Sequence, residues 1–550
     1  MTPPEIRSRI FQRPWTWWFM VAVLAVVALA RLRLMNFPLE RDEGEYAYAG
    51  QLILQGIPPY ELAYNMKFPG TYLAYAAIMG LFGETPGGIH FGLLLLTMAT
   101  ALMLFWLGKK LLDETAGVVA ATSYAVLSIS TAMLGYSAHA THFGAFFVTA
   151  GLCLMWRAQQ NGNRRWLAGA GFLFGTAILM KQHAALIALW AGVTLLLASL
   201  RQNEIPVRRR LVGIAIFCLA VFLPFGFCCL WLWHAGVFEK FWFWTVDYAR
   251  AYVSIIHGSD LLAQLSWSLH SIFSDCWLWW VTVVGVGMVF MDERWRGRRG
   301  WFLGFGLMAT LTTAPGFYFR THYFLLTLPA AALLAGCAVS GGIHWLGKNP
   351  RTIKLRALPA AAYGLILVVA FFKFADVSSV LARYGGHALH GPEPVPESVV
   401  VADYLREHSS PNARIAVLGS EPQIYFYARR HSVTGYIYVY GLMEPQPFAL
   451  KMQREMIAEI ESNAPAFIVY STIGSSWQRR PNSNPAIFNW WASYQANYDL
   501  VGIAEILSLV ETKFYWNEDA ARHGPLQNIG LEIYRRKTTV SPPTVSAKPT

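Results

Sequence analysis

Charged residues are scarce in this 550-residue sequence. Asp, Glu, Lys and Arg together make up 14% of it, whereas hydrophobic residues make up 55%. Soluble globular domains carry about 25% charged residues, so this composition excludes a chain built only of ordinary soluble domains. The net charge of +12 comes from short basic clusters between apolar runs. That distribution argues against a nucleic-acid partner and is typical of loops kept on the cytoplasmic side of a membrane.

Cysteine is also rare, and the polar part of the chain after residue 376 has none. Neither a CxxC pair nor the Cys/His spacing of a zinc site is present, which argues against a disulfide framework or a thiolate metal centre. A cleavable signal peptide is not indicated either. The first apolar run, 15–34, is not closed by an A-x-A-like site, so we expect it to remain as a membrane anchor. The six cysteines lie in apolar runs, where we expect small buried side chains: Cys153, Cys218, Cys228, Cys229, Cys276 and Cys337.

Long apolar runs occupy most of residues 1–376. A transmembrane helix needs about 20 predominantly apolar residues. The sequence predicts about eleven such helices, at 15–34, 88–108, 116–134, 139–156, 166–181, 183–200, 211–233, 271–290, 301–316, 322–340 and 357–375.

The loops between these runs differ in charge. Alternate loops, starting with the N-terminal segment, hold twenty Lys and Arg, whereas the opposite side holds nine up to residue 376. This asymmetry predicts a multi-pass protein of the cytoplasmic (inner) membrane with a cytoplasmic N-terminus. An odd number of spans then places the C-terminal part outside the cytoplasm.

The sequence pattern changes after the last apolar run. Residues 377–396 contain GGHALHGPEPVP and predict a linker. Beyond it, ESVVVADYLREH and KMQREMIAEIES predict helices, and RIAVLG, AFIVY and GLEIYRR predict strands. The predicted fold class is therefore a polytopic α-helical membrane protein over 1–376, with about eleven transmembrane helices, followed by a small soluble α/β domain over 397–537. The polar stretch 538–550 predicts a disordered tail.

The first outer loop, about 36–87, is long enough to be functional. It contains RDEGEYAYAGQLILQGIPPYELAYNMKFPGTYLAY, so Asp42 and Glu43 follow the first span and Lys67 comes before Pro69. Charge alone leaves open a solvated rim of the membrane. The order of the features is more specific: an acidic pair, then PPY, then an aromatic-lined Lys-x-Pro-Gly.

That order resembles the polyprenyl-phosphate-dependent glycosyltransferases of the C-type membrane superfamily. Bacterial members include the lipid A aminoarabinose and galacturonosyl transferases, and the protein mannosyltransferases are more distant relatives. The resemblance covers about residues 36–340. Two further segments support the resemblance. GTAILMKQHAALIAL resembles the family's Lys-Gln segment at the outer end of a span, and FYFRTHYFLLTLPAAALLAG resembles its Arg…His-Tyr-Phe…Leu-Pro segment.

The resemblance implies an inverting glycosyltransferase that moves a sugar from a polyprenyl-phosphate-linked donor to an extracytoplasmic acceptor, which is a lipid, a glycan or a protein. It implies Asp42 as the base that receives the acceptor proton, with Glu43 beside it. Lys67 is the implied cation for the donor phosphate, to which Arg320 can add a planar guanidinium. The expected partners are this donor, an unidentified acceptor and the lipid bilayer, with no nucleic acid.

Several other polar and aromatic residues are predicted to lie at the outer ends of spans or in the outer loops. Ionisable residues at membrane depth usually face a cavity, so these residues are candidates for lining the site. An ordinary place in the membrane interface is the alternative for each of them. They are Tyr46, Tyr60, Lys181, His183, Asp247, Arg250, His322 and Tyr323.

His139 and His142 mark a departure from the family, which usually carries Asn-x-x-Glu or Asp at this point. On a helix, residues three apart share a face, and two histidines so placed can bind a divalent cation such as Zn²⁺, Mn²⁺ or Mg²⁺. The alternative is a pair of polar residues at the end of a span. The metal requirement stays open.

Two other functions remain compatible with the apolar runs. A polytopic transporter or lipid flippase often shows repeated halves and helices broken at the midplane, whereas this sequence has no internal repeat and carries its charges at the outer ends. A non-enzymatic envelope assembly factor would act through the exported α/β domain. Turnover of a polyprenyl-phosphate sugar would distinguish both from an enzyme.

Overall fold

The computed structural model describes residues 14–201, 206–253, 255, 258–348, 350–384, 387 and 391–537. The chain divides into two compact units, Met1–Arg383 and Tyr384–Thr550. The predicted boundaries at 376 and 397 remain predictions, and the predicted tail over 538–550 lies outside the described residues. Each unit is considered by itself below.

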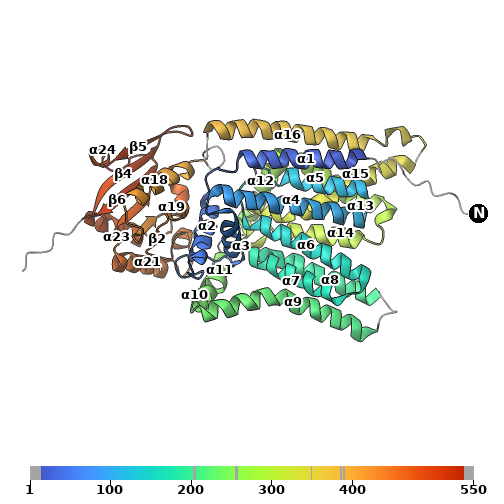
Figure 1. Ribbon diagram of the computed structural model, residues 1–550, viewed down its shortest axis with the longest axis horizontal. Coiled ribbons are helices and arrows are strands. Elements are labelled where there is room, and N and C mark those ends of the chain that lie inside the picture. The colour runs from blue at the N-terminus through green and yellow to red at the C-terminus, as the bar shows by residue number, and fades with distance from the viewer. Residues whose placement is uncertain are drawn as a thin grey trace, which may run out of the picture. The chain divides into compact units, whose positions relative to one another are not determined.

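The first unit is helical (Figure 1). Each of the eleven predicted apolar runs contains helical structure, although the run 271–290 is divided between two helices. The elements are α1 (Pro14–Arg33), α2 (Arg41–Leu54), α3 (Gly70–Phe82), α4 (Pro86–Leu111), α5 (Glu114–Leu127), α6 (Ala140–Asn161), α7 (Arg164–Met180), η1 (Gln182–Ala184), α8 (Ala185–Arg201), α9 (Val207–His234), α10 (Phe238–Trp242), η2 (Phe243–Tyr248), α11 (Ala249–Val253), α12 (Gly258–Asp275), α13 (Leu278–Met291), η3 (Glu293–Trp295), α14 (Arg299–Leu311), η4 (Pro315–Phe317), η5 (Thr321–Thr327), α15 (Leu328–Lys348), η6 (Ile353–Leu355) and α16 (Leu358–Tyr384).

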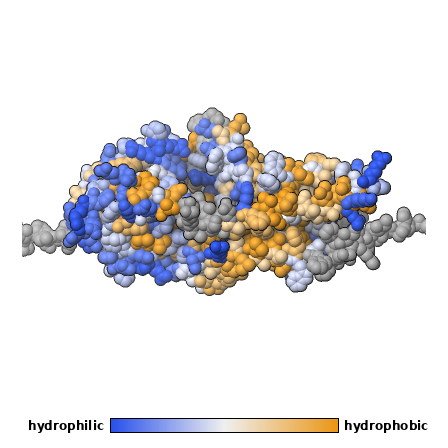
Figure 2. Space-filling view, turned by 90° about the horizontal axis from the view of Figure 1, so that it is seen from above, coloured by the Kyte–Doolittle hydropathy of each residue, from blue (hydrophilic) through white to orange (hydrophobic). Residues whose placement is uncertain are grey.

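Within the described residues, six helical segments are long and apolar enough to cross a membrane, and a bent pair made of α12 and α13 raises the number to seven. Others, such as α5 and α14, are only 14 and 13 residues long. The count of about eleven spans therefore stays a prediction. The surface supports the membrane assignment, because Phe222 and Phe372 are 69% and 74% exposed. Hydrophobic residues cover much of the visible surface of this unit (Figure 2). The chain is a multi-pass membrane protein.

Small residues allow α15 to lie at the centre of the helical unit. The most apolar 18-residue window of the segment Thr321–Lys348, which comprises η5 and α15, is completely buried. A Cβ atom added at Gly336 would come within 2.7 Å of the Ala116 carbonyl oxygen on α5, so only glycine permits this approach. Close backbone packing of this kind stabilises helix pairs in membranes, where the hydrophobic effect does not drive association.

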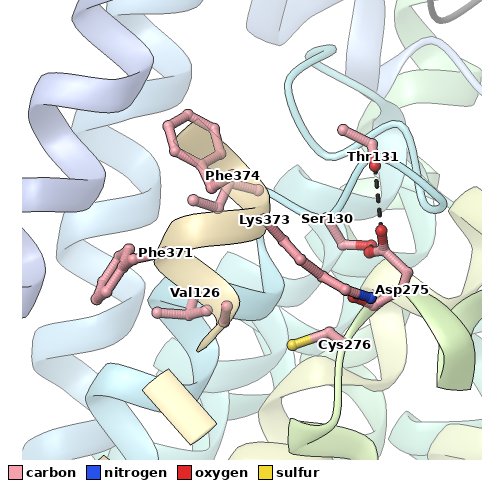
Figure 3. Close-up of a pocket in the computed structure, with 10 residues that line it drawn as sticks. Val126, Ser130, Thr131, Asp275, Cys276, Phe371, Lys373 and Phe374 are labelled. Atoms are coloured by element: carbon pink, nitrogen blue, oxygen red, sulfur yellow. Dashed lines mark hydrogen bonds between the residues drawn. The ribbon is translucent and has the colours of Figure 1, made fainter. Parts of the chain in front are cut away.

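Polar contacts attach α16 to α12. Asp275 accepts hydrogen bonds from Ser130 and, at 3.1 Å, from the Thr131 hydroxyl. Lys373 donates to the Ser274 carbonyl at 2.8 Å, which satisfies an oxygen at the C-terminal end of α12. These side chains line a pocket of about 40 Å³, in which Lys373 reaches toward Asp275 (Figure 3). A space so small has room for little more than ordered water, so we assign it a structural role.

The predicted first outer loop contains two helices, α2 and α3. The Glu40 side chain caps α2, accepting hydrogen bonds from the backbone nitrogens of Asp42 at 2.8 Å and Glu43 at 2.9 Å. A capping side chain satisfies N–H groups that have no partner within the helix. At the start of α3, a Cβ atom on Gly70 would lie 2.5 Å from the Leu179 carbonyl oxygen. Helices α2, α3, α10 and α11 gather at one end of the long helices (Figure 1).

The second unit is a small α/β domain, as predicted. Both predicted helices and all three predicted strands are confirmed, whereas β2, β4 and β5 were not predicted. The elements are α18 (Val395–Glu407), β1 (Arg414–Leu418), α19 (Gln423–Ala428), β2 (His431–Ser432), α20 (Tyr440–Met443), α21 (Ala449–Asn463), β3 (Phe467–Ser471), α22 (Gly474–Trp477), α23 (Ala486–Tyr494), η7 (Gln495–Asn497), β4 (Tyr498–Ile506), β5 (Thr512–Trp516), α24 (Glu518–His523) and β6 (Gly530–Arg536).

One mixed sheet organises this domain, with strand order β2-β1-β3-β6-β4-β5. Strand β1 pairs in parallel with β2 and β3, and Val417 lies opposite Val469 in the central pair. Strand β6 runs antiparallel to β3 and β4, and β4 runs antiparallel to β5. Residues 415–418 of β1 are buried. A parallel strand covered on both faces is expected to be almost continuously apolar. This explains why RIAVLG could be predicted as a strand from the sequence.

Candidate active site

Lys67 joins two carboxylates of α2. Its Nζ atom lies 2.8 Å from Asp42 Oδ1 and 2.7 Å from Glu45 Oε2. Asp42 and Glu45 are three residues apart, so the helix presents both side chains on one face. The Glu45 side chain is 1% exposed, whereas the side chains of Asp42 and Lys67 keep 19% and 18% exposure. The group is therefore largely enclosed but open to a ligand on the side of Asp42 and Lys67.

Three tyrosines hold this group in place. The Tyr72 hydroxyl donates to Glu45 Oε1 at 2.6 Å, and the Tyr60 hydroxyl donates to the Lys67 carbonyl at 2.6 Å. Lys67 Nζ also lies 4.5 Å from the centroid of the Tyr46 ring, a cation–π contact. Tyr46 and Tyr60 were predicted from the sequence, whereas Tyr72 and Glu45 were not. The spacing of Glu45 from Asp42 was the signal that could have identified it.

The charges of this group stabilise one another. Burial opposes ionisation of Asp42, but Lys67 and the nearby histidines outweigh it and hold the pKa of the Asp42 carboxyl well below its usual range. Burial likewise disfavours the ammonium of Lys67, but Asp42 and Glu45 hold its pKa well above its usual range. Burial raises the pKa of Glu45 even though Lys67 opposes the change. Asp42 and Lys67 are therefore both charged at physiological pH.

Glu43 points to a different part of the molecule. Its Oε1 atom accepts the backbone N–H of Ala138 at 2.6 Å and lies 3.0 Å from His90 Nε2. His90 Nδ1 in turn lies 2.8 Å from the Met35 carbonyl oxygen. Consecutive helical residues are about 100° apart around the axis, so Asp42 and Glu43 cannot face the same ligand. The contacts of Glu43 connect α2 with α4 and with the segment before α6.

Replacing Glu43 with Gln is expected to lower thermal stability more than activity. The substitution removes the charge from a carboxylate that is buried between His90 and the Ala138 N–H. Weakening a hydrogen bond to a charged group costs about 1.5–3 kcal/mol. Thermal unfolding of the purified protein should show the loss, and donor affinity of the protein that remains folded should be unchanged. Reduced turnover at an unchanged melting temperature would instead support the catalytic role predicted from the sequence.

His139 lies beside Asp42 and His322 rather than on a shared helical face with His142. One ligand atom from each of Asp42, His139 and His322 lies within 4.8 Å of the other two, and the two imidazole rings stack with centroids 4.6 Å apart. His139 caps α6 with an extended backbone, φ −61° and ψ 149°, so the helical spacing does not apply to it. His142 Nε2 lies 3.1 Å from the Gly135 carbonyl oxygen. Two imidazole nitrogens and one carboxylate oxygen make a possible metal-binding triad.

Two more cations lie close to this group. Lys181 follows the last residue of α7, and its Nζ atom lies 4.3 Å from the centroid of the Tyr323 ring. Arg320 lies over the Tyr318 ring at 5.5 Å. The charge of Lys181 interacts with those of Lys67, Asp42 and Arg320. Burial and the neighbouring charges of Lys67 and Arg320 lower the pKa of Lys181 to about 7, so a bound anionic ligand would favour its charged form.

His183 and Tyr323 complete the wall near Lys181. His183 Nδ1 lies 2.9 Å from the Thr312 carbonyl oxygen, and its ring meets that of Tyr323 edge-on with centroids 5.0 Å apart. The His322 ring meets Tyr323 in the same way at 4.8 Å. The structure thus brings together all the predicted lining residues from the first outer segment, the Lys-Gln segment and the Arg…His-Tyr segment.

Sequence similarity relates this chain to known transferases. Residues 67–227 match the family described as dolichyl-phosphate-mannose-protein mannosyltransferase. The chain is 24% identical over 404 residues to an undecaprenyl phosphate-alpha-4-amino-4-deoxy-L-arabinose arabinosyl transferase of Edwardsiella ictaluri (strain 93-146), covering 69% of this chain and 68% of that protein.

Solved structures extend the likeness to nearly the whole chain. ArnT from Cupriavidus metallidurans, bound to undecaprenyl phosphate, superimposes with a TM-score of 0.58 at 16% identity, covering 91% of this chain and 97% of that chain. An oligosaccharyltransferase of Archaeoglobus fulgidus, tethered to an acceptor peptide, gives a TM-score of 0.51 at 12% identity, with 94% and 76% covered. The chain has the C-type membrane glycosyltransferase fold.

The aromatic segment WTVDYARAY lies in η2 and α11. Residues Phe243–Tyr248 form a π-helix, a rare conformation that is frequent at functional sites. Trp244 stacks on Tyr64 with centroids 5.8 Å apart, which packs this segment against the first outer segment. Asp247 is half-buried in the π-helix, and Arg250 is exposed on α11. Among the described residues, no ion pair joins either of them to Lys67 or Asp42, so their part in the site remains a prediction.

Proposed function

We propose that this protein transfers a sugar from a polyprenyl-phosphate-linked donor to an acceptor, with inversion at the sugar carbon. The observation that carries the proposal is the enclosed group of Asp42, Lys67 and Glu45, with Lys181 and Arg320 beside it. It combines a carboxylate base with cations for a departing phosphate in a membrane-embedded fold. The C-type fold supports the assignment, as do relatives named for undecaprenyl phosphate and dolichyl phosphate.

The cations serve the leaving group in this proposal. As the bond between the sugar carbon and the phosphate oxygen breaks, the phosphate gains negative charge. Fixed cations aimed at that charge stabilise the transition state without having to reorganise. Lys67 and Lys181 act as point charges, whereas Arg320 offers a planar pair of N–H donors. The apolar helices next to them provide the surface for the polyprenyl chain.

Asp42 takes the acceptor proton in this proposal. The acceptor group attacks the sugar carbon from the face opposite the phosphate, and its proton passes to an Asp42 carboxylate oxygen. Asp42 is held in the ionised form that a general base requires. A positioned base contributes about 10²–10⁴-fold to the rate. A single displacement of this kind inverts the configuration. The acceptor is a lipid, a glycan or a protein.

Release of polyprenyl phosphate tests the proposed function. The purified protein in lipid, given a polyprenyl-phosphate sugar and an envelope extract as acceptor, should release polyprenyl phosphate and transfer the sugar. Movement of the intact sugar-lipid across a vesicle bilayer, with no release, would favour a flippase. Neither release nor movement would favour an assembly factor. Mass analysis of lipids and glycans in a deletion strain would then identify the sugar and the acceptor.

The orientation follows from the charge asymmetry and is part of the proposal. The N-terminus is cytoplasmic, and the site and the C-terminal domain lie outside the cytoplasmic membrane. A reporter that is active only outside the cytoplasm should be active when fused after residue 400 and silent when fused after Arg210. The opposite pair of results would reverse the topology and place Asp42 in the cytoplasm.

As an alternative role for Asp42, we propose that it binds a divalent cation together with His139 and His322. The donor set fits Zn²⁺ or Mn²⁺ better than Mg²⁺, which prefers oxygen ligands. When bound, such an ion would supply positive charge near the donor phosphate. Chelation should then lower activity, and added metal should restore it.

Metal content gives this prediction a second measurement. His322→Ala should lose bound metal, whereas His142→Ala is the matched control, because the His142 ring contacts the Gly135 carbonyl instead of the triad. Activity and metal content that are indifferent to chelation and to His322→Ala would remove the ion from the proposal.

A further inference from the structure

A pocket of about 380 Å³ opens on the C-terminal domain, between α18 and the end of β5. Small-molecule sites have volumes of about 300–1,000 Å³ and combine aromatic walls with a few polar groups. This pocket has both kinds of lining and belongs entirely to the second unit. It is lined by Val400, Asp403, Tyr404, Glu407, His408, Trp516 and Asn517.

Three stacked rings form the wall of the pocket. Tyr404 lies between His408, with centroids 4.0 Å apart and planes at 21°, and Trp516, with centroids 4.2 Å apart and planes at 12°. Tyr404 is 7% exposed, whereas Trp516 is half-buried and His408 is exposed. Behind the tryptophan, a Cβ atom on Gly502 would meet the indole at 2.5 Å, so the glycine makes room for the ring. Phe514 continues the column beyond Trp516, with centroids 6.3 Å apart and planes at 12°. The fold thus fixes a rigid column of rings, one side of which remains partly open to solvent.

The polar side of the pocket is strained and acidic. Asn517 has φ 51° and ψ −116°, a conformation that residues with a side chain rarely adopt and that is found mainly where function requires it. Its Oδ1 atom accepts the Tyr404 hydroxyl at 3.0 Å, which leaves the amide N–H₂ group to donate to a ligand. Asp403 is paired with Arg406 at 2.6 Å. Glu407, one residue farther along α18, is exposed and forms no ion pair with the described residues.

We propose that this pocket binds one sugar ring of a glycan. The apolar face of a pyranose packs on a flat aromatic surface, and its hydroxyl groups donate to carboxylates and accept from an amide N–H₂. The side chains of Asp403, Glu407 and Asn517 supply those complementary groups next to the ring column. Arg406 compensates the charge of Asp403, so the charge of Glu407 is what disfavours phosphate and acidic sugars and favours neutral or amino sugars. The pocket is therefore a carbohydrate site that is separate from the group around Lys67.

This inference goes beyond the proposed function and depends on it in one respect only. If the protein is a glycosyltransferase, the bound sugar belongs to the acceptor glycan. Binding itself requires no turnover, so the two proposals can fail separately.

Saturation-transfer NMR on the full-length protein in lipid nanodiscs tests the site. The probes are methyl glycosides of a neutral hexose, an N-acetylhexosamine, an aminohexose and a hexuronic acid. We expect a saturation-transfer signal from the first three glycosides and none from the hexuronide. Trp516→Ala should weaken binding at least tenfold, and Trp516→Phe should retain part of it. Glu407→Gln should weaken binding of the aminohexose more than that of the neutral hexose.

Trp490→Ala is the matched control, since Trp490 lies on α23 of the same domain, stacks on Tyr494 at 4.7 Å and is absent from the pocket. It should bind sugars normally. If Trp516→Ala does not fold, Glu407→Gln and Asn517→Gly decide the question in its place. The proposal would be overturned if the wild-type protein gave no saturation-transfer signal with any of the sugars. It would also be overturned if the signal survived unchanged in these variants. Release of polyprenyl phosphate with no sugar binding would overturn this inference alone, and binding without release would overturn the proposed function alone.

Discussion

Asp42→Asn is expected to abolish most turnover of the lipid-linked sugar while nearly preserving donor affinity. Asparagine keeps the size of the side chain and can still accept a hydrogen bond from Lys67, but it cannot take up the acceptor proton. Loss of a positioned base costs about 10²–10⁴-fold in rate. An interaction made mainly in the transition state lowers kcat more than it changes binding. Single-turnover release of polyprenyl phosphate and a separate donor titration would measure the two effects.

Two variants make this result specific. Glu45→Gln removes the other carboxylate at Lys67, 2.7 Å from its Nζ atom. If Glu45→Gln loses turnover with donor affinity nearly preserved, and Asp42→Asn does not, the base is Glu45. Metal content of Asp42→Asn distinguishes a base from a metal ligand, because a ligand role would lower metal binding together with turnover. A folded Asp42→Asn protein with normal turnover would falsify the catalytic assignment.

Arg320→Met and Lys67→Met are expected to reduce donor affinity about ten- to hundredfold each, since a charge-assisted hydrogen bond contributes about 1.5–3 kcal/mol. Methionine keeps a long side chain but removes the charge. Lys181→Met should act in the same direction, because its charge belongs to the same group. A binding titration with a polyprenyl-phosphate sugar would measure the loss of donor affinity.

Lys67 requires a further measurement, because its removal leaves Asp42 and Glu45 buried without their cation. Breaking a buried ion pair from one side costs about 3–5 kcal/mol of stability. Lys67→Met should therefore lower both the melting temperature and donor affinity, and Arg320→Met should lower donor affinity. Lys240→Met is the control, since Lys240 contacts the Tyr64 hydroxyl at 2.8 Å in an outer segment and lies outside the cluster. Full donor affinity in folded Arg320→Met and Lys181→Met proteins would contradict the phosphate role.

The amino-acid sequence by itself determined the multi-pass helical unit, the α/β domain after it, and the first outer segment as the place of the chemistry. Hydrophobic runs and their periods are local properties, so α15 and β1 are visible in the order of residues alone. Asp42 and Lys67 could also be predicted as site residues, because the family resemblance lies in their order along one segment. The helical structure of that segment was missed, since α2 is too polar to show a clear apolar face.

Only the tertiary structure decided which side chains meet. The Glu40 cap sets where α2 begins, and the start of the helix fixes the direction of each side chain around its axis. Asp42 and Glu45 therefore point toward Lys67, whereas Glu43 points to His90. His139 meets His322, not its sequence neighbour His142, because the backbone at His139 is extended and distant helices pack beside it. Contacts between residues far apart in the chain depend on how whole helices pack, and no local pattern encodes that packing.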